Sequence, residues 1–288
     1  MSHIPNMAPA EGSNMQYIDQ TITGIDGSEA RFIGYAIDNS DEVDPNRHRP
    51  TVLVIPGGGY VMTSDREAEP IALKFVGAGY NAFILRYSCQ PSRYPTALLE
   101  AAEAMRLIRA HADAWHVDPD RIAVSGFSAG GHLAANLATT AGDDTLREHG
   151  YDPDAVRPNA LMLSYPVITS GPFAHRGSFD AVLGPDRSGD PAWLDALSIE
   201  KHIDGKTPPV FAWHTVTDQA VPVENTLMLI QACKAAGVPI EAHLFPEGAH
   251  GLALGTVETA WEGKVANTVE CIQVWPRLAL DWLRRTLA

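Results

Sequence analysis

A serine between two glycines is the first group in this sequence whose surroundings suggest chemistry. Ser128 stands in the run Gly126–Gly130 (GFSAG), after the short apolar run Ile122–Ser125 and before a helical pattern over His132–Thr139. A sharp turn from strand to helix leaves no room for side chains two positions either side of the serine. Such a turn lifts the hydroxyl clear of the sheet and places it at a helix N-terminus, where partial positive charge favours an oxyanion. The pattern predicts a nucleophile; the alternative is an ordinary serine N-cap.

Three adjacent glycines follow an earlier apolar run, Thr51–Ile55, in the sequence Pro56–Tyr60 (PGGGY). Their backbone N–H groups are unshielded and can approach a substrate oxygen closely. We expect the amides of Gly58 and Gly59, together with that of Ala129, to form an oxyanion hole. A phosphate-binding loop would need a following Gly-Lys-Ser/Thr, and a dinucleotide-binding loop would need G-x-G-x-x-G; neither is present. A flexible glycine turn is the remaining alternative.

A serine nucleophile needs a base, and the base needs a carboxylate that orients it. Asp218 follows the apolar run Val210–His214, and His250 follows the run Ile240–Phe245. Each position alone is ordinary, because turns commonly carry polar residues. Their order after Ser128, each beyond the end of a late strand, predicts a triad of Ser128, Asp218 and His250.

Other histidines and acids are weaker candidates for these roles. His132 lies one helical turn past the serine, where packing against neighbours is expected, and His214 and His243 lie within strands. Glu224 falls in a predicted helix, and Glu247 is only three residues from the expected base. The two glutamates remain the alternatives for the acid.

Short apolar runs must position these groups. Runs that are apolar on both faces are typical of buried parallel strands, and they occupy Thr51–Ile55, Asn81–Tyr87, Ile122–Ser125, Ala160–Ser164, Val210–His214 and Ile240–Phe245. An alternating pair, Tyr17–Thr23 and Ala30–Asp38, predicts an antiparallel hairpin. Helical patterns lie between the runs, most clearly over Tyr94–Trp115 and Val223–Ala236. The alternation predicts an α/β fold, with an eight-stranded, mostly parallel sheet and helices on both faces.

We expect one domain over residues 1–288. Residues 1–15 are polar and predict a loose arm. Residues 142–159 and 169–207 are rich in turn residues, and we expect both segments to lie near the active site, above the carboxyl ends of the strands.

Composition narrows the partners. Lys plus Arg number 21 and Asp plus Glu 35, so the net charge of −14 argues against nucleic acid and anionic membranes and favours a neutral small molecule. Three cysteines without C-x-x-C spacing predict neither a disulfide framework nor a structural zinc site. The eleven histidines are scattered, so no metal or other cofactor is expected. No signal peptide or membrane span is visible, which predicts a cytoplasmic protein, and a homo-oligomer is left open.

Several motifs together resemble the bacterial carbohydrate-esterase branch of the α/β-hydrolase superfamily, whose members include acetyl, acetyl xylan and feruloyl-like esterases. The motifs are Pro56–Tyr60, Arg66–Pro70, Gly126–His132, Tyr165–Gly171, Ala174–Phe179 and Trp213–Thr215. The resemblance covers about Thr51 to the C-terminus and implies the α/β-hydrolase fold. Pro56 stands before the glycine triplet where the hormone-sensitive-lipase pattern has histidine.

We therefore expect a serine carboxylic-ester hydrolase that removes short acyl groups, acetyl above all, from a carbohydrate or a small alcohol. A feruloyl esterase, a peptidase or arylformamidase with the same triad, and an inactive binding module are the alternatives. A glycoside hydrolase would need paired carboxylates, and no motif supports such a pair. Residues after the strand Ala160–Ser164, together with the glycine loop, are expected to line the substrate pocket: Tyr60, Phe173, His175, Arg176 and Phe179.

Overall fold

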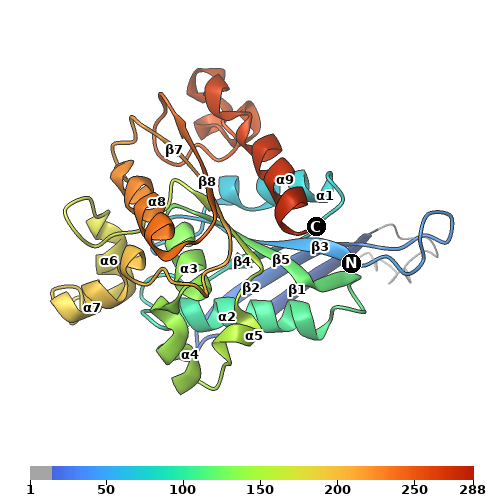
Figure 1. Cartoon of the computed structure of the whole chain (residues 1–288), viewed down its shortest axis with the longest axis horizontal. Coiled ribbons are helices and arrows are strands. Elements are labelled where there is room, and N and C mark those ends of the chain that lie inside the picture. The colour runs from blue at the N-terminus through green and yellow to red at the C-terminus, as the bar shows by residue number, and fades with distance from the viewer. Residues whose placement is uncertain (1–14) are drawn as a thin grey trace, which may run out of the picture.

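One eight-stranded sheet runs through residues 15–288, the part of the chain that the computed structural model describes (Figure 1). In sequence order its strands are β1 (Met15–Thr23), β2 (Glu29–Ile37), β3 (Arg49–Ile55), β4 (Asn81–Arg86), β5 (Val117–Phe127), β6 (Ala160–Ser164), β7 (Val210–Thr215) and β8 (Ile240–Phe245). They lie side by side in the order β1-β2-β4-β3-β5-β6-β7-β8. Only β2 runs against its neighbours, and all pairs from β4 to β8 are parallel. The predicted mostly parallel sheet is confirmed.

The register of the central strands gathers the predicted site at one edge of the sheet. Ile55 at the end of β3 pairs with Gly126 of β5, and Gly126 pairs with Leu163 of β6. Leu163 in turn pairs with Ala212 of β7. Because these strands are parallel and end together, the loops that follow them meet above the same edge.

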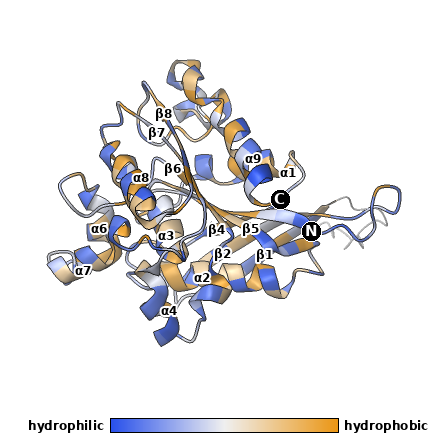
Figure 2. Ribbon diagram, in the orientation of Figure 1, coloured by the Kyte–Doolittle hydropathy of each residue, from blue (hydrophilic) through white to orange (hydrophobic). Residues whose placement is uncertain are grey.

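Helices cover both faces of this sheet (Figure 1). One face, with the larger hydrophobic cluster, carries α2 (Thr96–Ala110), α3 (Ser128–Ala138) and α8 (Glu224–Ala236). The opposite face carries α1 (Glu69–Val76) and α9 (Trp275–Thr286). Shorter helices are α4 (Asp143–Glu148), α5 (Pro153–Val156), α6 (Arg176–Leu183) and α7 (Pro191–Ala196). Figure 2 shows the central strands mainly in the hydrophobic colour, whereas the outlying helix α4 is mostly hydrophilic.

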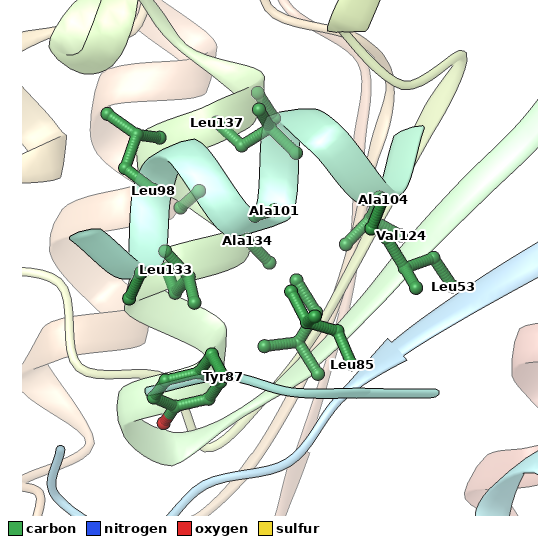
Figure 3. Packing of buried hydrophobic residues seen from close by; sticks show 14 of the residues in the cluster. Leu53, Leu85, Tyr87, Leu98, Ala101, Ala104, Val124, Leu133, Ala134 and Leu137 are labelled. Atoms are coloured by element: carbon green, nitrogen blue, oxygen red, sulfur yellow. The ribbon is translucent and has the colours of Figure 1, made fainter. Parts of the chain in front are cut away.

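Tight packing between α2, α3 and the sheet fixes the start of α3, where Ser128 lies. Leu98 and Ala101 of α2 belong to one buried cluster with Leu133 and Ala134 of α3, and Leu53 of β3 joins it from the sheet (Figure 3). Alanines at the contact let the helix backbones approach, and each buried leucine contributes about 1.5–3 kcal/mol of transfer free energy. The helix behind the serine is therefore held firmly against the strands.

The predicted helix Tyr94–Trp115 is shorter in the structure. Helix α2 begins at Thr96, after Pro95, and ends at Ala110, since His111 has left helical backbone angles. His116 then has a positive φ of 52°, which turns the chain into β5. The apolar pattern in the sequence extends to Trp115, beyond the end of the helix, because the Trp115 ring packs on Phe83 of the sheet.

The prediction that residues 142–159 lie near the active site is wrong. Helix α3 carries the chain from Ser128 back to the amino ends of the strands before this segment begins. There it forms α4 and α5, and Arg157 Nη1 donates a hydrogen bond to the Ala138 carbonyl at the last residue of α3 (2.9 Å). The predicted arm, residues 1–15, lies outside the described residues except for Met15, which opens β1. Within residues 15–288, no helix is long and apolar enough to cross a membrane.

Candidate active site

Ser128 occupies a turn that only glycine-rich sequence permits. It follows β5 directly, begins α3 and has a positive φ of 53°. A Cβ atom on Gly126 would lie 2.5 Å from the Gly130 carbonyl oxygen, and one on Gly130 would lie 2.3 Å from the Ile55 carbonyl oxygen. Both distances are far inside van der Waals contact, so the two glycines predicted from the motif are sterically required here.

A continuous line of hydrogen bonds joins the three predicted triad residues. Ser128 Oγ lies 2.7 Å from His250 Nε2, and His250 Nδ1 lies 2.6 Å from Asp218 Oδ2. The other carboxylate oxygen, Oδ1, accepts from the amides of Ala220 and Val221 (2.9 and 3.0 Å). Because a carboxylate only accepts, Nδ1 carries the proton and Nε2 is free to accept from the serine hydroxyl. The hydrogen bonds of His250 thus go to Asp218 and Ser128, and neither Glu224 nor Glu247 takes the acid's place.

A second histidine, His214, also contacts the acid. Its Nε2 lies 3.3 Å from Asp218 Oδ2 and 3.0 Å from the Val221 carbonyl, while its Nδ1 lies 2.7 Å from Thr226 Oγ1. Two acceptors at Nε2 place the proton there, so Thr226 donates to Nδ1. Burial would raise the pKa of Asp218, but hydrogen bonds from His214 and then His250 outweigh it and hold that pKa well below its usual range. The acid is therefore a buried carboxylate that is charged at neutral pH.

The glycine loop is held by a buried glutamate that the sequence analysis did not single out. Glu67, 2% exposed, accepts a hydrogen bond from the Gly57 amide at Oε2 (2.7 Å). Among residues 15–288, no hydrogen bond uses the amides of Gly58 or Gly59. Ala129 lies in the first turn of α3, where amides lack intrahelical partners. The amides of Gly58 and Gly59, which share a pocket lining with Ser128, are thus available as donors, and the Ala129 amide remains the expected third donor of an oxyanion hole.

Tyr165 connects that glutamate to the loop carrying the histidine. Its hydroxyl donates to Glu67 Oε1 (2.7 Å) and accepts from the Ala253 amide (2.9 Å). Its ring meets the His250 ring edge to face, with centroids 5.1 Å apart. Burial, followed by the charge of Glu67, raises the pKa of Tyr165 well above its usual range, so the hydroxyl remains a donor. Glu67 and Tyr165 therefore fix the glycine loop and the histidine relative to each other.

A pocket of about 310 Å³ opens above the serine. Its lining comes from the glycine loop, the start of α3, the segment before α6 and the chain after β8, and comprises Gly58, Gly59, Val61, Met62, Ser64, Arg66, Glu67, Ser128, His175, His250, Gly251 and Trp261. His175 is the one residue in this lining from the five predicted to bind substrate. Burial, then the nearby His250, lowers the pKa of His175.

The other four predicted substrate residues lie elsewhere. Tyr60 is buried, with its hydroxyl 2.8 Å from His132 Nδ1, and Phe179 is buried against the same imidazole ring. Arg176 donates a hydrogen bond to the carboxylate of Asp180, one helical turn along α6. Phe173 is 40% exposed but outside the pocket lining. Tyr60 and Phe179 belong to the apolar layer that packs the pocket loops onto the sheet. For this reason neither side chain lines the pocket.

No group of three or more His, Cys, Asp or Glu side chains suited to a metal ion occurs among residues 15–288. His132 and His214, which the sequence analysis set aside, are both buried and hydrogen-bonded.

Comparison with known proteins places the chain in a family. The model of the BD-FAE family matches residues 42–232, about two thirds of the sequence. The chain belongs to the BD-FAE family. Its fold is that of the α/β-hydrolases, as similar solved structures also show.

Two solved structures share most of their length with this BD-FAE member. The acetyl ester-xyloside bifunctional hydrolase of Caldicellulosiruptor lactoaceticus is 38% identical, with a TM-score of 0.76 over 90% of this chain and 88% of that one. The carboxylesterase Cest-2923 of Lactobacillus plantarum is 29% identical, with a TM-score of 0.82 over 95% and 99%.

Curated relatives are longer. Endo-1,4-beta-xylanase B of Butyrivibrio fibrisolvens is 35% identical over 75% of this chain, and an acetylxylan esterase of Xylanibacter ruminicola is 28% identical over 71%. The matched part spans only 34% and 41% of those two proteins.

Proposed function

We propose that this BD-FAE protein is a serine ester hydrolase that removes short acyl groups, acetyl above all, from a carbohydrate or a small alcohol. The hydrogen-bonded line Asp218–His250–Ser128 at the floor of a pocket carries the proposal. Membership of the family, and the likeness to proteins named as esterases, support it.

The first half of the reaction forms an acyl-enzyme. Ser128 Oγ attacks the ester carbonyl carbon as His250 Nε2 accepts the hydroxyl proton. The carbonyl electron pair moves onto oxygen, and the amides of Gly58, Gly59 and Ala129 donate hydrogen bonds to that oxyanion. Asp218 stabilises the imidazolium that results. Collapse of the tetrahedral intermediate breaks the ester C–O bond, and His250 gives its proton to the leaving alcohol.

The second half reverses these roles with water as the nucleophile. His250 takes a proton from water, the hydroxide adds to the acyl carbon, and the same amides bind the second oxyanion. Collapse returns the proton to Ser128 Oγ and releases the carboxylic acid. The residues named handle every bond and proton in this cycle, so the proposed reaction needs no cofactor.

Two observations support a short acyl group and a sugar alcohol. The pocket volume of about 310 Å³ is at the small end of the range for ligand sites, roughly 300–1,000 Å³. Relatives include proteins named acetylxylan esterase and acetyl ester-xyloside hydrolase. A cytoplasmic location and the absence of nucleic-acid and membrane partners remain predictions from the sequence, which predicts no particular oligomeric state.

An acyl-length series with a nucleophile control tests the proposal. For the wild type, kcat/KM over p-nitrophenyl esters should peak at two to four acyl carbons and fall sharply by eight, because a methylene that does not fit must clash. Ser128→Ala should lose roughly a million-fold in kcat with unchanged circular dichroism. A peak at octanoate, or a strong preference for methyl ferulate, would contradict the short-acyl assignment; full activity in Ser128→Ala would contradict the nucleophile.

A further inference from the structure

One wall of the pocket is an exposed tryptophan. Trp261 opens a short 3-10 turn (Trp261–Gly263) in the chain between β8 and α9, and it lines the same pocket as Ser128 and His250. It is 62% exposed, whereas Trp213 and Trp275 are buried in the core. Its exposed surface lies in the pocket that holds the reacting groups, where it is available to a ligand.

Arg66 fixes this ring next to the histidine. The guanidinium carbon lies 4.1 Å from the centroid of the Trp261 ring, within the range of a cation–π contact. Arg66 Nη1 donates to the carbonyls of Gly251 (2.6 Å) and Thr259 (3.2 Å). Since Gly251 follows His250 in the chain, the stacked pair is tied to the loop that carries the base.

The chemistry of the reaction says which part of the substrate meets this wall. The leaving alcohol oxygen must take its proton from His250 Nε2, so it lies next to that nitrogen. The rest of the alcohol then extends past Gly251 toward Arg66 and Trp261.

We propose that Trp261, backed by Arg66, is the platform for a pyranose ring in the alcohol part of the substrate; this inference rests on the proposed ester hydrolysis. A sugar ring has apolar C–H faces, which pack on aromatic rings, and a rim of hydroxyl groups. Arg66 Nη2 makes no hydrogen bond among the described residues, so it can donate to such a hydroxyl. The exposed side chains of Val61 and Met62 add apolar surface to the same pocket.

The kinetics of Trp261 variants on a small ester and on a sugar ester test this platform. Acetate release would be followed with ethyl acetate, which has no ring, and with acetylated xylo-oligosaccharides. For Trp261→Ala we expect KM for the oligosaccharides to rise about ten-fold, the size of a lost aromatic contact, with a much smaller change in kcat. The loss of kcat/KM should be at least five times larger for the oligosaccharides than for ethyl acetate, and Trp261→Phe should recover most of it.

Trp193→Ala is the matched control. Trp193 of α7 also stacks on an arginine, Arg187 (4.5 Å), but lies outside the pocket lining, so its loss should leave the ratio between the two substrates unchanged. Binding is measured separately, by calorimetry, with acetylated xylotriose and the Ser128→Ala protein with and without Trp261→Ala. A ten-fold weaker Kd in the double variant supports the platform.

The outcomes separate this inference from the proposed function. A wild-type protein that hydrolyses neither ester contradicts the proposed function. A wild type active on both esters, with equal losses in Trp261→Ala or none, overturns the platform while the esterase assignment stands. Phenyl acetate is assayed as a third ester. A loss in Trp261→Ala confined to phenyl acetate, with oligosaccharides unaffected, shows that the ring binds aryl groups and overturns the sugar assignment.

Discussion

Asp218 is the most constrained side chain of the site, since all its acceptor positions face donors and the side chain is fully buried. Asp218→Asn would place an amide opposite His250 Nδ1 and favour the tautomer in which Nε2 carries the proton. We expect kcat to fall on the order of 10⁴-fold, as loss of a triad acid does elsewhere. Ser128→Ala combined with Asp218→Asn should cost little beyond Ser128→Ala alone, because the triad acts as a unit.

Steady-state kinetics with p-nitrophenyl acetate checks this prediction. Thermal melting of each variant serves as the control for folding. Wild-type kcat in Asp218→Asn would contradict the assignment of Asp218 as the acid of the triad.

The sequence predicts the reacting residues better than it predicts the residues that hold them in position. Ser128 and the glycines around it form a local motif whose steric need can be argued from sequence alone. Glu67 and Tyr165 are 98 residues apart, and their contact depends on loops that meet only in the folded sheet. The same holds for Tyr60 and Phe179, whose apolar character suits both a pocket wall and a packed interior.

Between β5 and α3, steric contact sets the position of the serine. A Cβ atom at Gly130 would meet the carbonyl oxygens of Ile55 and Pro56 at 2.3 Å, and both belong to backbone that cannot swing aside. Gly130→Ala should therefore push α3 away from β3, lowering both stability and kcat, with the free energy of unfolding reduced by about 1–3 kcal/mol as in other overpacked sites.

Gly205→Ala is a matched control, since nothing lies within 4 Å of a Cβ atom there. Urea unfolding and esterase rates of the two variants would be compared. Equal behaviour of Gly130→Ala and Gly205→Ala would mean that the close approach of α3 to β3 does not hold Ser128 in place.

Strands were more predictable than the segments between them. Runs such as Val210–His214, which becomes β7, are apolar on both faces because helices cover both sides of the sheet, and this leaves a direct mark on the sequence. Helix ends and loop positions depend on long-range contacts instead. Residues 142–159 are polar and turn-rich wherever they lie, so composition could not show that they sit at the far end of the sheet. The chain around Trp261 likewise carries no periodic pattern.

For the molecule as a whole, the buried imidazole of His132 makes the free energy of unfolding depend on pH. Burial lowers the pKa of His132 to about 4, although its hydrogen bond to the Leu197 carbonyl opposes this. The unfolded chain binds a proton at this site near pH 6.5, and the folded chain only near pH 4. Neutral His132 therefore contributes its full stabilisation to the free energy of unfolding above pH 6.5. That free energy decreases as the pH falls toward 4, by about 3 kcal/mol at pH 4.

Urea unfolding of the wild type and of His132→Gln at pH 7 and pH 4 tests this linkage. Other groups contribute to both proteins alike, so the fall in unfolding free energy between the two pH values should be smaller in His132→Gln. Parallel pH profiles would show that His132 does not titrate differently in the two states.

The central claim is that Ser128, activated by His250, becomes acylated. The most direct measurement is covalent labelling with an alkyl fluorophosphonate, followed by intact mass and peptide mapping. We expect a single adduct on the peptide containing Ser128, forming in step with the loss of p-nitrophenyl acetate hydrolysis, and no adduct in Ser128→Ala. An adduct on another residue, or full activity after complete labelling of Ser128, would contradict the account.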